Sequence, residues 1–367
     1  MLATRLTEKL GCQYPIVQTA MGWVADPHLV AGSCNAGGFG FLAGATIPPE
    51  EMERDILRVK DLTARPFGVN FHMYQPNAAA IVDMVIRHGV RAVSYSRSPG
   101  PEFIGRLKSA GVVCMPTVGL VKHAIKAVAL GADVVTVQGG EGGGHTGAIP
   151  TTLLVPQVIE AVGGEVPVVA AGGFKDGRGL VAALAWGADG IAMGTRFLMT
   201  AESPVPRATL QRYVDCANPG EIVVSRAMDG LPQRMIMNEL LTELERAGKL
   251  HKLWIALRNG LAFRQHTGAS LFGLLKTAIA MSGDDAVTAS QAIMSANAPM
   301  IIQKAMVEGE PARGVLPSGQ VAGVIDDLPT CAGLVSAIVA EAQQRLLELA
   351  QRAANNQGGV FAANRPD

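Results

Sequence analysis

The chain repeats one pattern up to about residue 200: a short apolar run of strand length, a stretch with helical spacing, and a glycine before the next run. This glycine lies in four phrases: His88-Gly89-Val90, Ala110-Gly111-Val112, Leu130-Gly131-Ala132 and Trp186-Gly187-Ala188. Each glycine stands where a helix is expected to end in the left-handed backbone region, which glycine adopts without strain. Strands that alternate with helices in this way indicate a parallel sheet with crossover helices.

The pattern yields eight candidate strands, the number that a closed (β/α)8 barrel needs. The expected strands are Pro15–Gln18, Phe39–Leu42, Phe67–Asn70, Ala92–Ser94, Val112–Thr117, Val134–Gln138, Val168–Ala171 and Gly190–Met193. The expected helices are Pro27–Asn35, Pro48–Asp61, Asn77–His88, Pro101–Ala110, Val121–Leu130, Thr152–Ala161 and Gly177–Trp186. We therefore predict the α/β class, with a (β/α)8 TIM barrel.

The pattern changes beyond Phe197, which predicts a largely helical insertion after strand 8. Its helical segments are expected at 210–213, 237–246, 252–257, 271–281 and 286–300, followed by a glycine turn and a final helix at 332–349. The predicted domains are a barrel of residues 1–203 and 317–350, a helical substrate-side region of residues 204–316, and a flexible tail of residues 351–367. Basic residues in the insertion suit either a channel for an anionic substrate or a solvated helix face: Arg234, Lys249, Lys252, Arg258, Arg264 and Lys276.

Charge and cysteine content limit the expected partners and location. The 31 basic and 31 acidic side chains cancel, which gives no electrostatic reason to expect nucleic acid or an anionic membrane. The five cysteines form no metal-binding pattern, so we expect no metal and a reducing compartment. Residues 1–10 lack the apolar core of a signal peptide, and the most apolar later stretch, residues 180–193, is too short for a membrane span. A soluble, cytoplasmic protein is expected.

Glycine clusters follow the last three expected barrel strands. Residues 139–147 follow the sixth strand, Gly172 and Gly173 the seventh, and Gly194 and Thr195 the eighth. Loops after the seventh and eighth strands of such barrels commonly bind phosphate through backbone N–H groups. Tight turns alone would not explain why both clusters occur on adjacent strands, so we predict a phosphate site there. The 139–147 loop is expected to leave clearance for a flat ring and a bulky ligand.

Polar side chains also end several of the apolar strands. Asn70, Thr117 and Gln138 suit hydrogen bonds to a planar heterocycle, although each taken alone also suits a turn. Together with the small residues after the first strand, they form a ring around a shared mouth. Those small residues are Ala20, Met21 and Gly22.

His145 is the candidate catalytic residue, as a general base or a hydrogen-bond donor, because a histidine ordinarily exchanges a proton near neutral pH. His72, which follows the third strand, is a second candidate to face the mouth. The remaining histidines are expected in surface or capping roles: His28, His88, His123, His251 and His266. Motifs for a nucleophile elbow, a phosphate loop or a zinc helix do not occur, so a cofactor must supply the reactivity.

Six motifs together resemble the nitronate monooxygenase (2-nitropropane dioxygenase-like) family of FMN-dependent TIM-barrel enzymes, a group that includes NADH:quinone reductases and FabK-type enoyl reductases. The motifs are Pro15–Gly22, Asn35–Gly40, Pro66–Asn70, Gly142–Gly147, Ala171–Phe174 and Met193–Phe197. The resemblance covers residues 5–200 and resumes at 314–346. It implies that His145 occupies the family's catalytic-histidine position. It also implies FMN held by Ala20, Met21, Gly22, Asn70, Thr117, Gln138, Gly144, Gly172, Gly173, Gly194 and Thr195.

Two longer stretches, together with the basic insertion, resemble the IpdC-type branch of that family. The stretches are Val137–Gly147 and Gly314–Gly323. The branch implies oxidation of a hydroindane-type acyl-CoA during steroid-ring degradation. Gln138 and the triple glycine Gly142–Gly144 depart from the nitronate-oxidising members, which counts against nitronate turnover.

The leading hypothesis is an FMN-dependent oxidoreductase that removes a hydride and a proton from adjacent carbons of a cyclic acyl-CoA and so introduces a double bond. It requires a small-molecule substrate and an electron acceptor, which is NAD(P), a quinone or oxygen. The alternatives are a nitronate monooxygenase, an NAD(P)H:quinone reductase, and a flavin-binding sensor or scaffold without turnover. Homo-oligomer formation stays open.

Overall fold

The protein is described here by a computed structural model that covers residues 2–44, 47–72, 77–96, 100–246 and 289–362. Parallel strands close into a barrel in the order β1-β2-β3-β4-β5-β6-β8-β9, which confirms the predicted fold class. These strands are β1 (Ile16–Gln18), β2 (Phe39–Ala43), β3 (Gly68–Asn70), β4 (Ala92–Ser96), β5 (Val113–Val118), β6 (Val135–Gln138), β8 (Val168–Ala171) and β9 (Gly190–Met193).

Helices connect successive barrel strands, and their observed ends agree with the predicted ends to within one or two residues. They are α2 (Pro27–Asn35), α3 (Pro49–Leu62), α4 (Ala78–Arg87), α5 (Pro101–Ser109), α6 (Val121–Ala129), α7 (Thr151–Val162) and α8 (Gly177–Ala185). The predicted glycine ends are confirmed, because Gly89, Gly111, Gly131 and Gly187 have φ of 60°, 73°, 98° and 95°. Since all strands run parallel, the loops that follow them meet at one mouth.

A helix that the sequence analysis did not predict, α1 (Arg5–Leu10), closes the other end of the barrel. Leu6 and Leu10 are fully buried and share one apolar cluster with inward-facing residues of the strands. The Arg5 guanidinium donates to the Asp189 carboxylate at 2.9 and 2.8 Å, and the same carboxylate accepts from the Val168 N–H at 3.0 Å. The helix is therefore held by apolar burial and by a charged contact to the strands.

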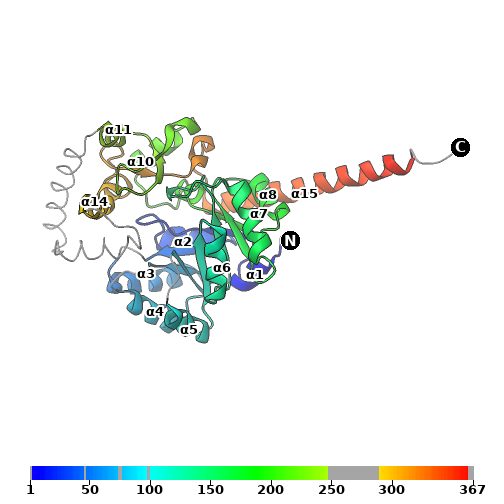
Figure 1. The fold of residues 1–367 in the computed structure, drawn as a ribbon, viewed down its shortest axis with the longest axis horizontal. Coiled ribbons are helices and arrows are strands. Elements are labelled where there is room, and N and C mark those ends of the chain that lie inside the picture. Colours follow the sequence, from blue (N-terminus) through cyan, green and yellow to red (C-terminus); the bar gives the residue numbers. More distant parts are fainter. Residues whose placement is uncertain (1, 45–46, 73–76, 97–99, 247–288, 363–367) are drawn as a thin grey trace.

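The insertion after β9 contains the predicted helical segments that fall within the described residues: α10 (Arg207–Val214), α11 (Glu239–Arg246) and α14 (Ala289–Met306). These helices gather at one end of the molecule (Figure 1). A short helix, α9 (Thr195–Leu198), links β9 to this region. The segments predicted at 252–257 and 271–281 lie outside the described residues. The domain limits at 203/204 and 316/317 stay a prediction.

The sequence analysis missed a β-hairpin in this region, formed by β10 (Ile222–Ser225) and β11 (Gln233–Ile236) with η1 (Pro219–Glu221) before it. One edge of β11 pairs with β10. The other edge pairs with β12 (Leu316–Pro317) and with β7 (Gly144–His145), which lies in the loop after β6. The hairpin therefore joins the insertion directly to a loop at the barrel mouth.

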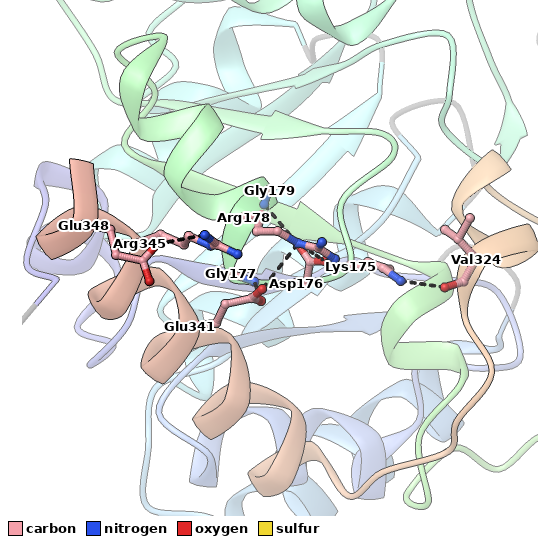
Figure 2. Close-up of polar contacts among 9 residues, drawn as sticks. All are labelled: Lys175, Asp176, Gly177, Arg178, Gly179, Val324, Glu341, Arg345 and Glu348. Atoms are coloured by element: carbon pink, nitrogen blue, oxygen red, sulfur yellow. Dashed lines mark hydrogen bonds and ion pairs between the residues drawn. The ribbon is translucent and has the colours of Figure 1, made fainter. Parts of the chain in front are cut away.

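The last helix, α15 (Cys331–Ala362), follows η2 (Gln320–Val324) and packs on α8 and α2. Figure 2 shows Glu341 of α15 at the start of α8, where its carboxylate accepts from the Gly177 N–H at 2.8 Å. A Cβ on Gly177 would lie 2.5 Å from the Ile338 carbonyl oxygen, so the two helices need a glycine there.

The far part of α15 projects from the barrel (Figure 1). The helix is longer than the predicted helix, which ended at Leu349, and it includes residues 351–362 of the predicted tail. Among the helices within the described ranges, none combines the length and the apolar character that a bilayer crossing requires.

We predict that Leu6→Ala lowers the free energy of unfolding by about 2–5 kcal/mol, because it removes a fully buried side chain from the closed end of the barrel. Denaturant unfolding followed by circular dichroism measures this loss. Leu57→Ala is the matched control, since Leu57 lies in α3 with 46% of its surface exposed, and its effect should stay within about 0.5 kcal/mol. Equal losses in the two variants would contradict the role assigned to α1.

Candidate functional site

A cavity of about 380 Å³ opens at the carboxyl ends of the barrel strands, a size within the range of ligand pockets. The leading catalytic candidate and all the predicted cofactor-binding residues line this cavity. They are His145, Ala20, Met21, Gly22, Asn70, Thr117, Gln138, Gly144, Gly172, Gly173, Gly194 and Thr195. Ile302 and Met306 of α14 also line it, so the insertion supplies part of the wall.

Backbone N–H groups gather where the sequence predicts a phosphate. Gly172 and Gly173 have φ of 101° and 85°, a conformation that L side chains rarely adopt. Within the described ranges, neither of their N–H groups donates to another part of the chain. Gly194 and Thr195 lie at the start of α9, where N–H groups are also free of helical partners. This set of neutral donors suits a bound anion.

The polar ring is ordered by hydrogen bonds within the chain. The Asn70 amide donates to the Ser94 hydroxyl at 2.9 Å and to the Ser94 carbonyl at 3.1 Å, which fixes the orientation of the amide. The Gln138 amide donates to the His145 carbonyl at 3.0 Å. At Gly22 and Gly144 no atom lies within 4 Å of the position that a Cβ would take. The ring therefore combines fixed polar groups with open space, as a planar ligand requires.

Two glycines of the 139–147 loop serve the packing of the chain itself, in contrast to the predicted clearance for a ligand. A Cβ on Gly139 would lie 2.1 Å from Thr151 Oγ1, and a Cβ on Gly143 would lie 2.4 Å from the Gly319 nitrogen. Glu141 fixes the same loop, because its carboxylate accepts from Thr151 N at 2.8 Å and from Thr151 Oγ1 at 2.6 Å at the start of α7. An acidic group is favourable there because a helix N-terminus is positive.

Arg234 of β11 holds the loop from the insertion side. Its guanidinium donates to the Gly140 carbonyl through Nε at 3.1 Å and through Nη2 at 2.8 Å. Burial lowers the pKa of this guanidinium, although the nearby Glu141 carboxylate raises it. Arg234, which was predicted to line a basic channel, therefore binds protein backbone. The other five basic residues of that prediction lie outside the described residues.

His145 lies in β7 at the cavity, and Asp229 holds its ring. His145 Nε2 is 2.9 Å from Asp229 Oδ2, and 56% of the histidine side chain is exposed compared with 6% of the aspartate side chain. Across the described part of the chain, Nδ1 of His145 makes no hydrogen bond. His72, the second candidate, is not among the lining residues, and its Nδ1 lies 3.3 Å from Ser96 Oγ.

The sequence analysis missed Asp229 and Trp23. Asp229 follows the β-branched run Ile222–Val224, and Asp229-Gly230 is a turn dipeptide, so the sequence does carry a signal for a β-hairpin here.

Trp23 lines the cavity with φ of 60°, and within the described ranges it is the one residue other than glycine with positive φ. A bulky residue in this region is uncommon, and such strain often accompanies functional sites.

Solved structures of similar fold include FabK from Thermotoga maritima. It is 28% identical to this chain with a TM-score of 0.75, and the match covers 96% of this chain and all of the FabK chain.

Similar sequences include a dehydrogenase of (3aS,4S,5R,7aS)-5-hydroxy-7a-methyl-1-oxo-octahydro-1H-indene-4-carboxyl-CoA from Rhodococcus jostii. It is 50% identical over 345 residues, which cover 94% of this chain and 97% of the relative. The dehydrogenase of the same name from Mycobacterium tuberculosis is 47% identical over 342 residues, with 93% and 96% coverage. A model of the nitronate monooxygenase family matches residues 3–91 and 78–341. The chain therefore belongs to the nitronate monooxygenase family, and it is an oxidoreductase.

Proposed function

We propose that this protein is an FMN-dependent dehydrogenase that acts on a ring-fused acyl-CoA thioester. The observation that carries the proposal is that Gly172 and Gly173, with their free N–H groups, and His145 line the same cavity. The similarity to two dehydrogenases of a hydroxy-indene-carboxyl-CoA, at 50% and 47% identity over nearly the full chain, supports the substrate class. A cytoplasmic location and an electron acceptor that reoxidises the flavin belong to the same proposal.

The residues around the cavity fit FMN in two ways. The N–H groups of Gly172, Gly173, Gly194 and Thr195 would hold the phosphate, because they are free donors at neighbouring strand ends, and the nearby Glu141 carboxylate is bound by Thr151. The fixed amides of Asn70 and Gln138 and the hydroxyl of Thr117 would contact the ring system. The open positions above Gly22 and Gly144 leave room beside these groups. When bound there, FMN supplies a two-electron acceptor for a hydride from the substrate.

His145 takes the proton that leaves with this hydride. Its Nε2 faces a carboxylate and so carries a hydrogen, which leaves the lone pair of Nδ1 to accept a proton from the carbon next to the thioester carbonyl. The electron pair of that C–H bond forms the new double bond as the hydride leaves the adjacent carbon. Two hydrogens and two electrons therefore leave the substrate, one hydrogen as a proton and one as a hydride.

The insertion forms the substrate side of the cavity in this proposal. Ile302 and Met306 of the insertion, with Val321 of η2 beside them, offer apolar surface to a fused ring, while the loop of residues 139–147 carries the histidine. The proposal keeps the predicted division of the chain. The barrel, residues 1–203 and 317–350, would hold the cofactor, and the insertion, residues 204–316, would cover the substrate. Apolar lining with few polar groups is typical of sites for small hydrophobic ligands.

We expect the FMN-loaded protein to bleach rapidly when it is mixed anaerobically with a hydroindane-type carboxyl-CoA. Flavin absorbance recorded by stopped flow measures the rate. Alkyl nitronate and NADH, mixed in parallel, should reduce the flavin at least about 100-fold more slowly, which corresponds to about 2.7 kcal/mol of transition-state discrimination. Rapid bleaching by a nitronate, or by NADH alone, would favour the monooxygenase or the quinone reductase. No bleaching by any of the three would favour a sensor or scaffold.

We expect His145→Gln to slow flavin reduction by the acyl-CoA by about 10²- to 10⁴-fold, the usual contribution of a positioned acid or base. FMN content, measured from the visible spectrum, should be unchanged. His123→Gln is the matched control, because His123 lies exposed in α6 away from the cavity. Equal rates in His145→Gln and the unmodified protein would exclude the histidine from the reaction.

We expect Gly173→Ala to weaken FMN binding by about tenfold, because an L-residue avoids the cost of a left-handed φ, about 1–2 kcal/mol, by moving the loop and its N–H groups away from the phosphate position. Equilibrium dialysis or flavin fluorescence quenching measures the dissociation constant. Gly164→Ala is the control, since Gly164 lies in an exposed turn after α7 with open space around it and without positive φ. Unchanged FMN affinity in Gly173→Ala would place the phosphate elsewhere.

A further inference from the structure

Asp229 is a buried carboxylate whose hydrogen-bond partners are two residues of its own hairpin, Leu231 and Gln233, and the cavity residue His145. Only 6% of its side chain is exposed. Oδ1 accepts from the Leu231 N–H at 2.9 Å, Oδ2 accepts from the Gln233 amide, and Oδ2 lies 2.9 Å from His145 Nε2. No lysine or arginine of the described residues pairs with it. Because a buried carboxylate is costly unless it is hydrogen-bonded, Asp229 favours a hydrogen on the imidazole nitrogen that faces it, and it would stabilise the positive charge that the ring gains when it takes a proton.

The backbone of the same hairpin sets the place of His145. His145 and Gly144 pair with Gln233 and Arg234 in the antiparallel register of β7 and β11. Gln233 therefore acts twice, since its backbone aligns His145 and its side chain donates to Asp229. The ring and the main chain of His145 are thus held by one hairpin of the insertion.

We propose that Asp229 is a positioning residue for His145. Its carboxylate accepts the hydrogen on Nε2, which selects one tautomer of the neutral ring and leaves Nδ1 unprotonated at the cavity. The inference rests on the proposed function, because it assigns Asp229 to the residue that takes the substrate proton. It also gives the insertion a direct part in the reaction, since Asp229 and Gln233 both belong to residues 204–316.

Asp229→Asn is the informative substitution, because the shape of the side chain is kept while one acceptor is lost. The carboxylate serves three donors, whereas an amide has a single oxygen. If the amide oxygen faces His145 and Gln233, the amide NH2 opposes the Leu231 N–H. If the amide oxygen faces Leu231, the NH2 opposes Nε2 and favours the other tautomer, in which Nδ1 carries the hydrogen.

The first test is a double-mutant cycle of the unmodified protein, Asp229→Asn, His145→Gln and the double variant, each loaded with FMN. Anaerobic stopped flow with the hydroindane-type carboxyl-CoA gives the limiting rate per bound FMN and the apparent Kd of the substrate. We expect Asp229→Asn to lower the limiting rate by about 10- to 100-fold, the range that loss of a histidine's hydrogen-bond partner costs at metal sites, with the Kd within about twofold. In the His145→Gln background the same substitution should change the rate by less than about threefold.

Asp189→Asn is the matched control. Asp189 is as buried as Asp229, with 7% of its surface exposed, but it lies at the closed end of the barrel on Arg5. It should lower the melting temperature and leave the rate per bound FMN unchanged. An equal loss of rate in Asp189→Asn and Asp229→Asn would show that Asp229→Asn acts by general destabilisation, and it would contradict the positioning role. An undiminished effect of Asp229→Asn in the His145→Gln background would overturn the assignment, because the aspartate would then act without the histidine.

The second test needs neither turnover nor FMN. Side-chain ¹⁵N NMR of the histidine-labelled protein at about pH 8.5, where histidines are ordinarily neutral, reports which ring nitrogen carries the hydrogen. The His145→Gln variant identifies the signal. We expect the Nε2–H tautomer in the unmodified protein and an increased share of the Nδ1–H tautomer in Asp229→Asn. An Nδ1–H tautomer in the unmodified protein overturns the inference.

The two tests separate two kinds of failure. If the unmodified protein is not bleached by the acyl-CoA, or if His145→Gln is as fast as the unmodified protein, the proposed function fails while the NMR result still decides the role of Asp229. If the protein is bleached and His145→Gln is slow, but Asp229→Asn is as fast as the unmodified protein, the inference fails alone.

Discussion

A short antiparallel pairing of two residues with two residues connects the loop after β6 to the insertion. Gly144 and His145, in the loop after β6, pair with Arg234 and Gln233 of β11. The guanidinium of Arg234 also donates to the Gly140 carbonyl of that loop. The barrel alone would present the histidine on a long glycine-rich loop with many accessible conformations. Pairing with the hairpin removes this freedom, and it brings a buried carboxylate to the ring of the histidine. The site is therefore shared between two parts of the chain, and its residues His145 and Asp229 are 84 positions apart.

The glycines around the cavity divide into two groups with different physical reasons. Gly139 and Gly143 have no room for a Cβ, because the backbone of Thr151 and of Gly319 passes too close. Gly172 and Gly173 have left-handed backbone and unused N–H groups, which is the arrangement that binds an anion. Sequence alone does not separate these groups, because both read as glycine after a strand. The distinction matters for mutation, since a change at Gly143 is expected to disturb the loop and a change at Gly173 the ligand.

The barrel was predictable because its signals are local. Each apolar run, each helical stretch and each glycine at a helix end is read within a window of about 20 residues, and parallel strands with connecting helices leave few alternative folds. The cavity residues were predictable from the barrel, because the carboxyl ends of its parallel strands meet at one mouth. The hairpin of β10 and β11 was not predicted, although Ile222–Val224 and Asp229-Gly230 indicate one, because the segments on either side of it have helical spacing and favour a helical region. Asp229 was out of reach for a different reason. Its role depends on contact with His145, 84 residues earlier, and no local pattern encodes that contact.

The proposed reaction requires one arrangement, in which cofactor phosphate, substrate ring and His145 Nδ1 meet in the same cavity. A crystal structure of the FMN-loaded protein with an unreactive acyl-CoA analogue tests it most directly. The account predicts the phosphate on the N–H groups of residues 172–173 and 194–195. It also predicts Nδ1 within about 2.6–3.5 Å of the carbon next to the thioester carbonyl, with Asp229 still on Nε2. A phosphate bound elsewhere, or an acyl ring out of reach of His145, would contradict it.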